Sequence, residues 1–129
     1  MSRSKLVVAI VDDEDTVRRA LERLFRSAGI ESEVFSGGGS FLDSLRSHHP
    51  DCVVLDLHMP GVTGFDVQAR LRELDLNIPV VVITGHDTPE SRGRVRELGA
   101  AVYLRKPVAA KALLEAIENA IGANHSTTP

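Results

Sequence analysis

The sequence has few cysteines and no excess of positive charge, and both features exclude classes of protein. Cys52 is the one cysteine among 129 residues, so no intrachain disulfide can form. It lies in an apolar run, which indicates a buried thiol in a protein of the reducing cytosol. The formal net charge of −3 leaves no surplus of lysine and arginine to neutralise a phosphate backbone. Direct binding of nucleic acid by this chain is therefore not expected.

Long hydrophobic runs are also absent. The apolar run Leu6 to Val11 follows a basic start, but it is too short for a secretory signal and ends at an acidic stretch, residues 12–15. No stretch approaches the ~18 consecutive apolar residues of a membrane span. We therefore expect a soluble, cytoplasmic protein that contacts no membrane. Its length and its 43% content of hydrophobic residues fit one domain with a single core.

Five short segments have the composition of β-strands. Four of them are mostly apolar and rich in β-branched residues, as strands covered on both faces require. These four are Leu6 to Val11, Cys52 to Leu55, Val80 to Ile83 and Ala101 to Leu104. The fifth, Glu31 to Phe35, has fewer apolar positions and is expected at a sheet edge.

Segments with helical spacing follow the strands. The clearest has an apolar face from Val17 to Ala28 and ends at Gly29. The others are marked by Phe41, Leu42 and Leu45, by Val67, Leu71 and Leu74, and by Leu113, Leu114, Ile117 and Ile121, the last closing before Gly122. Alternating strands and helices predict an α/β fold, a doubly wound three-layer sandwich around a parallel sheet. We expect one domain over residues 1–122 and a flexible tail or the start of a linker over 123–129.

The helix that follows Thr88 and Pro89 has a weak apolar face. Val95 and Leu98 are its only large apolar residues. Gly93 lies within it, at a cost of roughly 1 kcal/mol relative to alanine. We expect this helix to be the least firmly docked of the five.

Polar side chains follow four of the predicted strands. In an open α/β sheet, ligands bind at the carboxyl ends of the strands. Asp12 and Asp13 follow the first strand, Asp56 the third and Thr84 the fourth, and Lys106 comes shortly after the fifth. Taken alone, the first pair is typical of caps for the next helix. Taken together, these residues predict a site with three carboxylates, a hydroxyl and an ammonium.

Three carboxylates in one place need compensation. Each pair at ~4 Å repels by roughly 4 kcal/mol at an effective dielectric of 20. Oxygen ligands favour Mg²⁺, with Mn²⁺ as a possible substitute, and the sequence has no Cys/His set typical of zinc. A carboxylate can act as the nucleophile in phosphoryl transfer, and Asp56 is the candidate. Lys106 is expected to pair with one phosphoryl oxygen, Thr84 to donate a hydrogen bond to another, and the metal to hold a third.

At these residues the chain resembles the receiver domains of bacterial two-component response regulators. The resemblance runs from about Lys5 to Ile121. It is carried by Val11-Asp12-Asp13-Glu14, by Leu55-Asp56-Leu57-His58-Met59-Pro60-Gly61 through Gly64, by Ile83-Thr84-Gly85 and by Lys106-Pro107. It implies a flavodoxin-like fold with strand order 2-1-3-4-5. It also implies a phosphoacceptor signalling switch rather than an enzyme, with self-phosphorylation and autodephosphorylation as its only activities.

The same resemblance implies ligands, partners and a switch. Mg²⁺ is expected on Asp13, Asp56 and the backbone carbonyl of His58, with Asp12 helping through a water. The phosphoryl donor is expected to be a sensor histidine kinase, and receiver–receiver dimers are a further possibility. Thr84 is expected to move toward the phosphoryl group while Tyr103 turns inward. The surface of the fourth helix, fifth strand and fifth helix would then report phosphorylation to a partner or to an output domain, for which a transcriptional one is expected.

Several residues have a second interpretation. Tyr103 also fits a half-buried packing residue with its hydroxyl in solvent. His58 and His86 lie two residues after Asp56 and Thr84, so their side chains are candidates for tuning the lifetime of an aspartyl phosphate, and both also fit exposed loop histidines.

Two other functions compete with the receiver hypothesis. Asp13-Glu14-Asp15-Thr16-Val17 resembles the nucleophile motif of haloacid-dehalogenase-like phosphatases, but no acidic pair follows a late strand and Asp56 would be unexplained. The discriminating observation is which aspartate is phosphorylated. A degenerate receiver that only binds proteins is the second alternative, and the complete set of site residues argues against it. Neither a Walker loop nor a Gly-x-Gly-x-x-Gly turn supports a kinase or a dehydrogenase.

Overall fold

The computed structural model describes residues 5–125 of the chain. Five strands alternate with five helices over this range, in the predicted order. They are β1 (Val7–Val11), α1 (Asp15–Ser27), β2 (Glu31–Phe35), α2 (Gly38–Ser44), β3 (Cys52–Asp56), α3 (Gly64–Glu73), β4 (Val80–Thr84), α4 (Pro89–Glu97), β5 (Val102–Arg105) and α5 (Ala110–His125).

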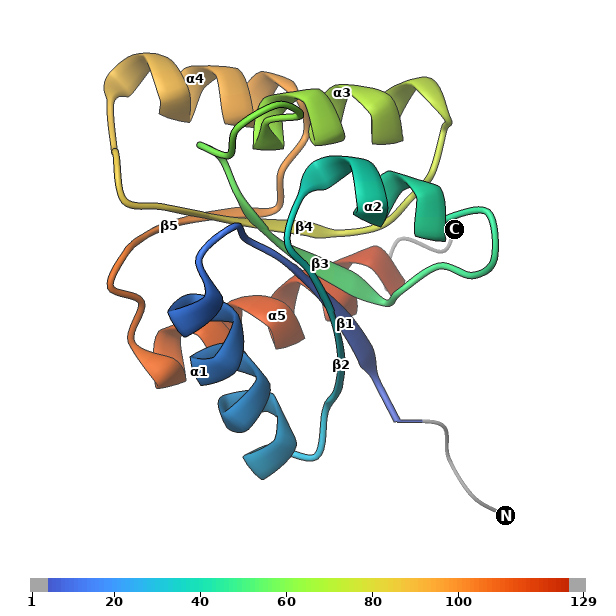
Figure 1. The fold of residues 1–129 in the computed structure, drawn as a ribbon, viewed down its shortest axis with the longest axis vertical. Coiled ribbons are helices and arrows are strands. Elements are labelled where there is room, and N and C mark those ends of the chain that lie inside the picture. Colours follow the sequence, from blue (N-terminus) through green and yellow to red (C-terminus); the bar gives the residue numbers. More distant parts are fainter. Residues whose placement is uncertain (1–4, 126–129) are drawn as a thin grey trace.

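The strands form one parallel sheet in the order β2-β1-β3-β4-β5. This is the flavodoxin-like order that the resemblance implies, and it is confirmed. Helices α1 and α5 cover one face of the sheet, while α2, α3 and α4 cover the other (Figure 1). Strand β2 lies at an edge as predicted, and its residues are exposed or only partly buried.

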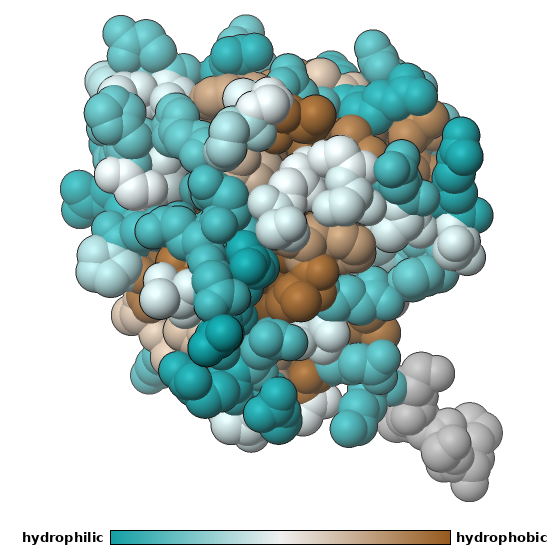
Figure 2. All heavy atoms as spheres, in the orientation of Figure 1, coloured by the Kyte–Doolittle hydropathy of each residue, from teal (hydrophilic) through white to brown (hydrophobic). Residues whose placement is uncertain are grey.

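Alternation along the central strands divides the core into two layers. Val8 and Ile10 point to the side of Phe25 and Ile117, whereas Ala9 and Val11 belong to the layer with Phe41 and Leu57. Both layers include fully buried side chains, because the sheet is covered on both faces. Figure 2 shows the outer surface of the molecule: hydrophilic residues cover most of it in this view, and hydrophobic residues are exposed mainly near the centre and toward the upper right.

Strands β1 and β5 begin one residue later than predicted, at Val7 and Val102. Three strands also end one residue later than predicted, and these differences concern the site. Strand β3 includes Asp56 and β4 includes Thr84, because Asp56 pairs with Ile83 and Thr84 pairs with Arg105 in the ladders. Strand β5 likewise runs to Arg105. The candidate functional residues on β3 and β4 therefore have the fixed backbone positions of strand residues.

The prediction that the last helix closes before Gly122 is wrong, since α5 continues to His125. Gly122 does not take the positive φ of a helix-ending glycine, whereas Gly29 does so after α1, with a φ of 75°. Residues 123–125 of the predicted tail are therefore helical, and residues 126–129 lie outside the described part of the chain. Within the described part, no helix is long and apolar enough to cross a membrane.

Helix α4 has the small buried face that the sequence predicts. Ser91 and Val95 are its buried residues, against five on α3. Its start is well defined, because the Thr88 side chain accepts a hydrogen bond from Ser91 N. Arg94 adds an exposed contact, with its guanidinium 4.2 Å from the centre of the Phe65 ring on α3. That α4 is the least firmly docked helix stays a prediction.

Two glycines provide a matched test of how α3 is positioned against the site. A Cβ at Gly64, the first residue of α3, would collide with the carbonyl oxygen of Asp56 and come within 2.7 Å of Leu57 Cα. A Cβ at Gly93 in α4 would have no neighbour within 4 Å. We expect Gly64→Ala to lower the free energy of unfolding by about 1–3 kcal/mol, since backbone must shift. Gly93→Ala should raise it by roughly 0.5–1 kcal/mol.

Urea denaturation of both variants, monitored by circular dichroism, measures these changes. Equal stability of the two variants would contradict the close approach of α3 to the end of β3.

Candidate functional site

An acidic cluster lies at the carboxyl ends of β1 and β3, which are neighbours in the sheet. One carboxylate oxygen from each of Asp12, Asp13 and Asp56 lies within 4.8 Å of the others. Asp12 and Asp56 are 0% and 3% exposed, while Asp13 is open to solvent. The structure thus brings together the three carboxylates that the sequence analysis singled out. Neither Asp12 nor Asp13 caps the next helix, because the cap residue of α1 is Glu14 and its cap has no side-chain hydrogen bond.

Lys106 reaches into this cluster from the loop after β5. Its Nζ lies 2.9 Å from Asp12 Oδ2, 2.8 Å from Glu14 Oε1 and 3.4 Å from Asp56 Oδ1. Its backbone N–H donates to the carbonyl of Thr84 at 2.7 Å, which ties this loop to the end of β4. Lys106 is therefore the ammonium expected at the site. The part of Glu14 in holding it was missed, since the two residues are 92 positions apart and no motif pairs them.

The pKa values of these groups reflect the crowding. Burial raises the pKa of Asp56 to about 7, the charge of Asp12 adds to the rise, and Lys106 opposes it. Burial disfavours the charged form of Lys106, but its hydrogen bond to Glu14 and its contact with Asp12 outweigh burial and raise its pKa. The Glu14 pKa is lowered by the hydrogen bond from Lys106. Lys106 is thus fixed in its charged form, while Asp56 is only partly ionised at neutral pH.

The donor set fits a hard divalent cation. Three carboxylates, those of Asp12, Glu14 and Asp56, contact the one ammonium of Lys106. Asp13 adds a further carboxylate beside Asp12 and Asp56, so negative charge remains uncompensated. Asp12 Oδ1 accepts a hydrogen bond from Glu14 N, and buried Asp12 Oδ2 lies 2.9 Å from the Lys106 ammonium. Oxygen ligands with exposed Asp13 on one side suit Mg²⁺ or Mn²⁺.

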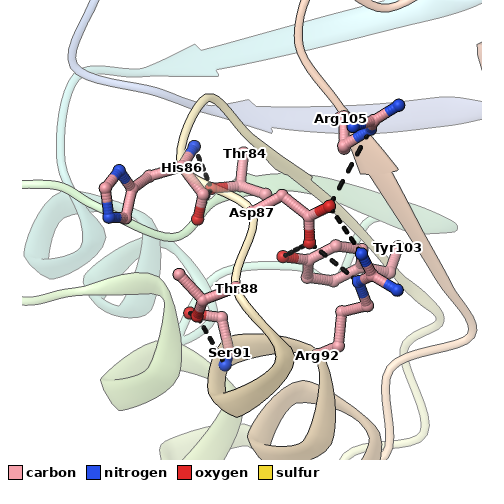
Figure 3. Close-up of polar contacts among 8 residues, drawn as sticks. All are labelled: Thr84, His86, Asp87, Thr88, Ser91, Arg92, Tyr103 and Arg105. Carbon is pink, nitrogen blue, oxygen red and sulfur yellow. Dashed lines mark hydrogen bonds and ion pairs between the residues drawn. The ribbon is translucent and has the colours of Figure 1, made fainter.

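Thr84 lies at the end of β4 and is fully buried, but its hydroxyl does not contact the acidic cluster. Thr84 Oγ1 accepts a hydrogen bond from His86 N at 3.0 Å and donates to His86 O at 3.3 Å (Figure 3). The hydroxyl is thus occupied by its own loop. The structure places Thr84 beside Asp56 on neighbouring strands and leaves the contact between them unmade.

The two candidate histidines meet above the strand ends. The ring centroids of His58 and His86 are 5.5 Å apart with an interplanar angle of 88°, an edge-to-face contact. Both side chains are exposed, and His58 also lies edge-on to Phe65. The two loops that follow β3 and β4 are therefore in contact through these rings. A metal contact of the His58 carbonyl stays a prediction.

Tyr103 is half-buried on β5, and its hydroxyl donates to Asp87 Oδ1 at 2.9 Å (Figure 3). Tyr103 is therefore half-buried, as the packing alternative expects, with its hydroxyl bonded to a side chain, and its role as a switch stays a prediction. Asp87 also binds Arg92 and lies near Arg105. Sequence reasoning missed this group, because its residues belong to no motif and come from a loop, a helix and a strand.

Comparisons with known proteins agree with this geometry. The family model for the response regulator receiver domain matches residues 8–118. The chain is 36% identical to the response regulator protein TodT of Pseudomonas putida, covering 94% of this chain and 53% of TodT. It is 32% identical to the transcriptional regulatory protein FixJ of Azorhizobium caulinodans, covering 91% and 56%. The chain thus spans about half the length of these curated relatives.

A solved structure gives the same result. The crystal structure of a response regulator receiver protein from Burkholderia phymatum superimposes with a TM-score of 0.81 at 40% identity, covering 92% of this chain and 96% of that chain. Sequence family, fold and site geometry all agree. The chain therefore belongs to the response regulator receiver domains, the phosphoacceptor signalling modules of two-component systems.

Proposed function

We propose that Asp56 is the phosphoacceptor of this receiver domain. The observation that carries the proposal is the position of Asp56, which is buried at the end of β3. Its carboxylate lies beside those of Asp12 and Asp13 and 3.4 Å from the Lys106 ammonium. Asp12, Asp13 and Asp56 would hold Mg²⁺, with Mn²⁺ as a substitute and the His58 carbonyl as a further ligand. The bound ion would supply positive charge to the oxygens of the transferred phosphoryl group.

The residues of the chain have separate tasks in this reaction. An Asp56 oxygen forms the new P–O bond as the bond between phosphorus and the donor's leaving group breaks. With a phosphorylated histidine of a sensor kinase as donor, the bond that breaks is P–N and the leaving imidazole takes up a proton. Lys106 pairs with one phosphoryl oxygen, and Thr84 turns its hydroxyl from His86 to another. Hydrolysis of the acyl phosphate, self-catalysed by the same site, returns the free carboxylate.

We further propose that the domain controls an output in a longer cytoplasmic protein. The chain covers about half of relatives such as FixJ, which is named a transcriptional regulatory protein. A transcriptional output fits that relationship, with the surface of α4, β5 and α5 as the reporting face and receiver–receiver dimers as one way to use it. The chain itself has a net charge of −3 and offers no basic footprint for DNA.

Phosphorylation of single-residue variants tests the phosphoacceptor and separates it from the phosphatase hypothesis. With acetyl phosphate and Mg²⁺, we expect wild type to gain one phosphoryl group by intact-protein mass spectrometry. Asp56→Asn should gain none, because the nucleophile is removed. Asp13→Asn should still be labelled at Asp56, but only at higher Mg²⁺ concentrations, because one ligand is lost. A label on Asp13 that persists in Asp56→Asn would contradict the proposal and support the phosphatase hypothesis.

The paired histidines provide a second prediction, on the lifetime of the phosphorylated form. His58 and His86 contact each other over the strand ends, where water must approach the acyl phosphate. We propose that they restrict this approach, so that His58→Ala and His86→Ala each speed loss of the phosphoryl group severalfold. His49→Ala, which removes an exposed imidazole outside the site, is the control. The decay of phosphorylated protein measures the effect, and identical rates in all four proteins would disprove it.

A further inference from the structure

Asp87 lies where three structural elements meet. It belongs to the loop between β4 and α4, and its side chain is 12% exposed. Arg92 of α4 donates to both of its carboxylate oxygens at 2.8 Å, and the Tyr103 hydroxyl of β5 donates to Oδ1 at 2.9 Å. Arg105 of β5 lies 3.8 Å from Oδ2. Figure 3 shows these groups converging on the one carboxylate.

The charges favour this arrangement at neutral pH. The hydrogen bonds from Arg92 hold the pKa of Asp87 below its usual range, and the hydrogen bond from Tyr103 acts in the same direction. Burial raises the pKa of Tyr103, and Asp87 raises it further. The carboxylate therefore stays ionised and the phenol keeps the proton that it donates.

The same loop connects Asp87 to the phosphorylation site. Thr84 is three residues earlier, and both hydrogen bonds of its hydroxyl go to the backbone of His86, next to Asp87. A hydroxyl that turns toward a phosphoryl oxygen on Asp56 must give up these bonds. The His86 backbone then loses its hydrogen bonds to Thr84. An open groove of about 540 Å³ adjoins this loop and is lined by residues including Thr84, Asp87 and Lys106.

We propose that Asp87 is a positioning residue that holds the loop, α4 and β5 in the unphosphorylated arrangement, and that capture of Thr84 by the phosphoryl group releases it. The inference rests on the proposed phosphorylation of Asp56. In this proposal the Asp87 carboxylate is the physical link by which a movement of the Thr84 hydroxyl reaches Tyr103. Release of Asp87 frees Arg92 and the Tyr103 hydroxyl together, and so changes the surface that α4 and β5 share.

Coupling of this kind is reciprocal, which makes it measurable. If phosphorylation breaks the Asp87 contacts, then removal of these contacts must favour the phosphorylated arrangement. Beryllofluoride with Mg²⁺ serves as the probe, because it stands in for the phosphoryl group on Asp56. We expect Asp87→Ala to bind it about tenfold more tightly than wild type. Asp43→Asn, which removes a carboxylate from α2 instead, should bind it as wild type does.

Tyr103 supplies a readout that a purely structural role would not produce. It is the only tyrosine, so the ¹³C NMR signal of a tyrosine labelled at the ring carbon bearing the hydroxyl reports this residue alone. In unliganded Asp87→Ala, the signal should move toward its position in beryllofluoride-bound wild type. The inference is overturned if Asp87→Ala binds beryllofluoride no more tightly than wild type does. It is also overturned if the Tyr103 signal of unliganded Asp87→Ala equals that of unliganded wild type.

Two further results keep the interpretation distinct. If Asp87→Ala does not fold, Tyr103→Phe carries the test, since it removes only the hydroxyl, and it should bind beryllofluoride a few-fold more tightly. Unchanged or weaker binding by a folded Tyr103→Phe then overturns the inference. If wild type itself does not bind beryllofluoride with Mg²⁺, the proposed function fails, whatever the variants do.

Discussion

The site depends on one imbalance of charge: four carboxylates gather at the end of a parallel sheet, and only one ammonium lies among them. Lys106 contacts three of them within 3.4 Å and cannot neutralise all of them. Burial raises the pKa of Asp56 to about 7, and the charge of Asp12 adds to the rise. The unmet negative charge makes a divalent cation suit this place. The balancing positive charges help the carboxylate to accept a phosphoryl group, because Lys106 and a bound cation would also attract the phosphate oxygens.

The fold fixes the backbone positions of the residues around the acidic cluster. Apolar strands covered on both faces hold Asp56 and Thr84 at adjacent strand ends, so neither depends on a mobile loop for its position. Gly64 lets the first turn of α3 lie directly against the carbonyl of Asp56. In the loop from Thr84 to Asp87, the hydroxyl that would meet the phosphoryl group is held by the His86 backbone. The proposed switch requires only that this hydroxyl turn from the His86 backbone while the acceptor stays in place.

Sequence reasoning predicted the elements, the layers and the gathering of Asp12, Asp13, Asp56 and Lys106, because buried parallel strands and the polar residues at their ends follow strong local rules. The expected contact of Thr84 with this group stays a prediction, because its hydroxyl is bonded to His86. Sequence reasoning did not predict the contact of Glu14 with Lys106 or the group around Asp87, which depend on side-chain directions across distant loops. It also ended the last helix too early, because the sequence does not show whether Gly122 is helical or a helix-ending residue. Long-range side-chain geometry therefore accounts for most of what was missed.

Mg²⁺ affinity as a function of pH tests the imbalance most directly. A cation that binds Asp56 must displace its proton below the pKa of about 7, and meets an ionised carboxylate above it. Calorimetric titration should therefore show affinity rising roughly tenfold per pH unit from pH 5.5 to near 7 and then levelling off. In Asp56→Asn this dependence should disappear. Equal Mg²⁺ affinity at all these pH values in wild type, or the same profile in Asp56→Asn, would contradict the account.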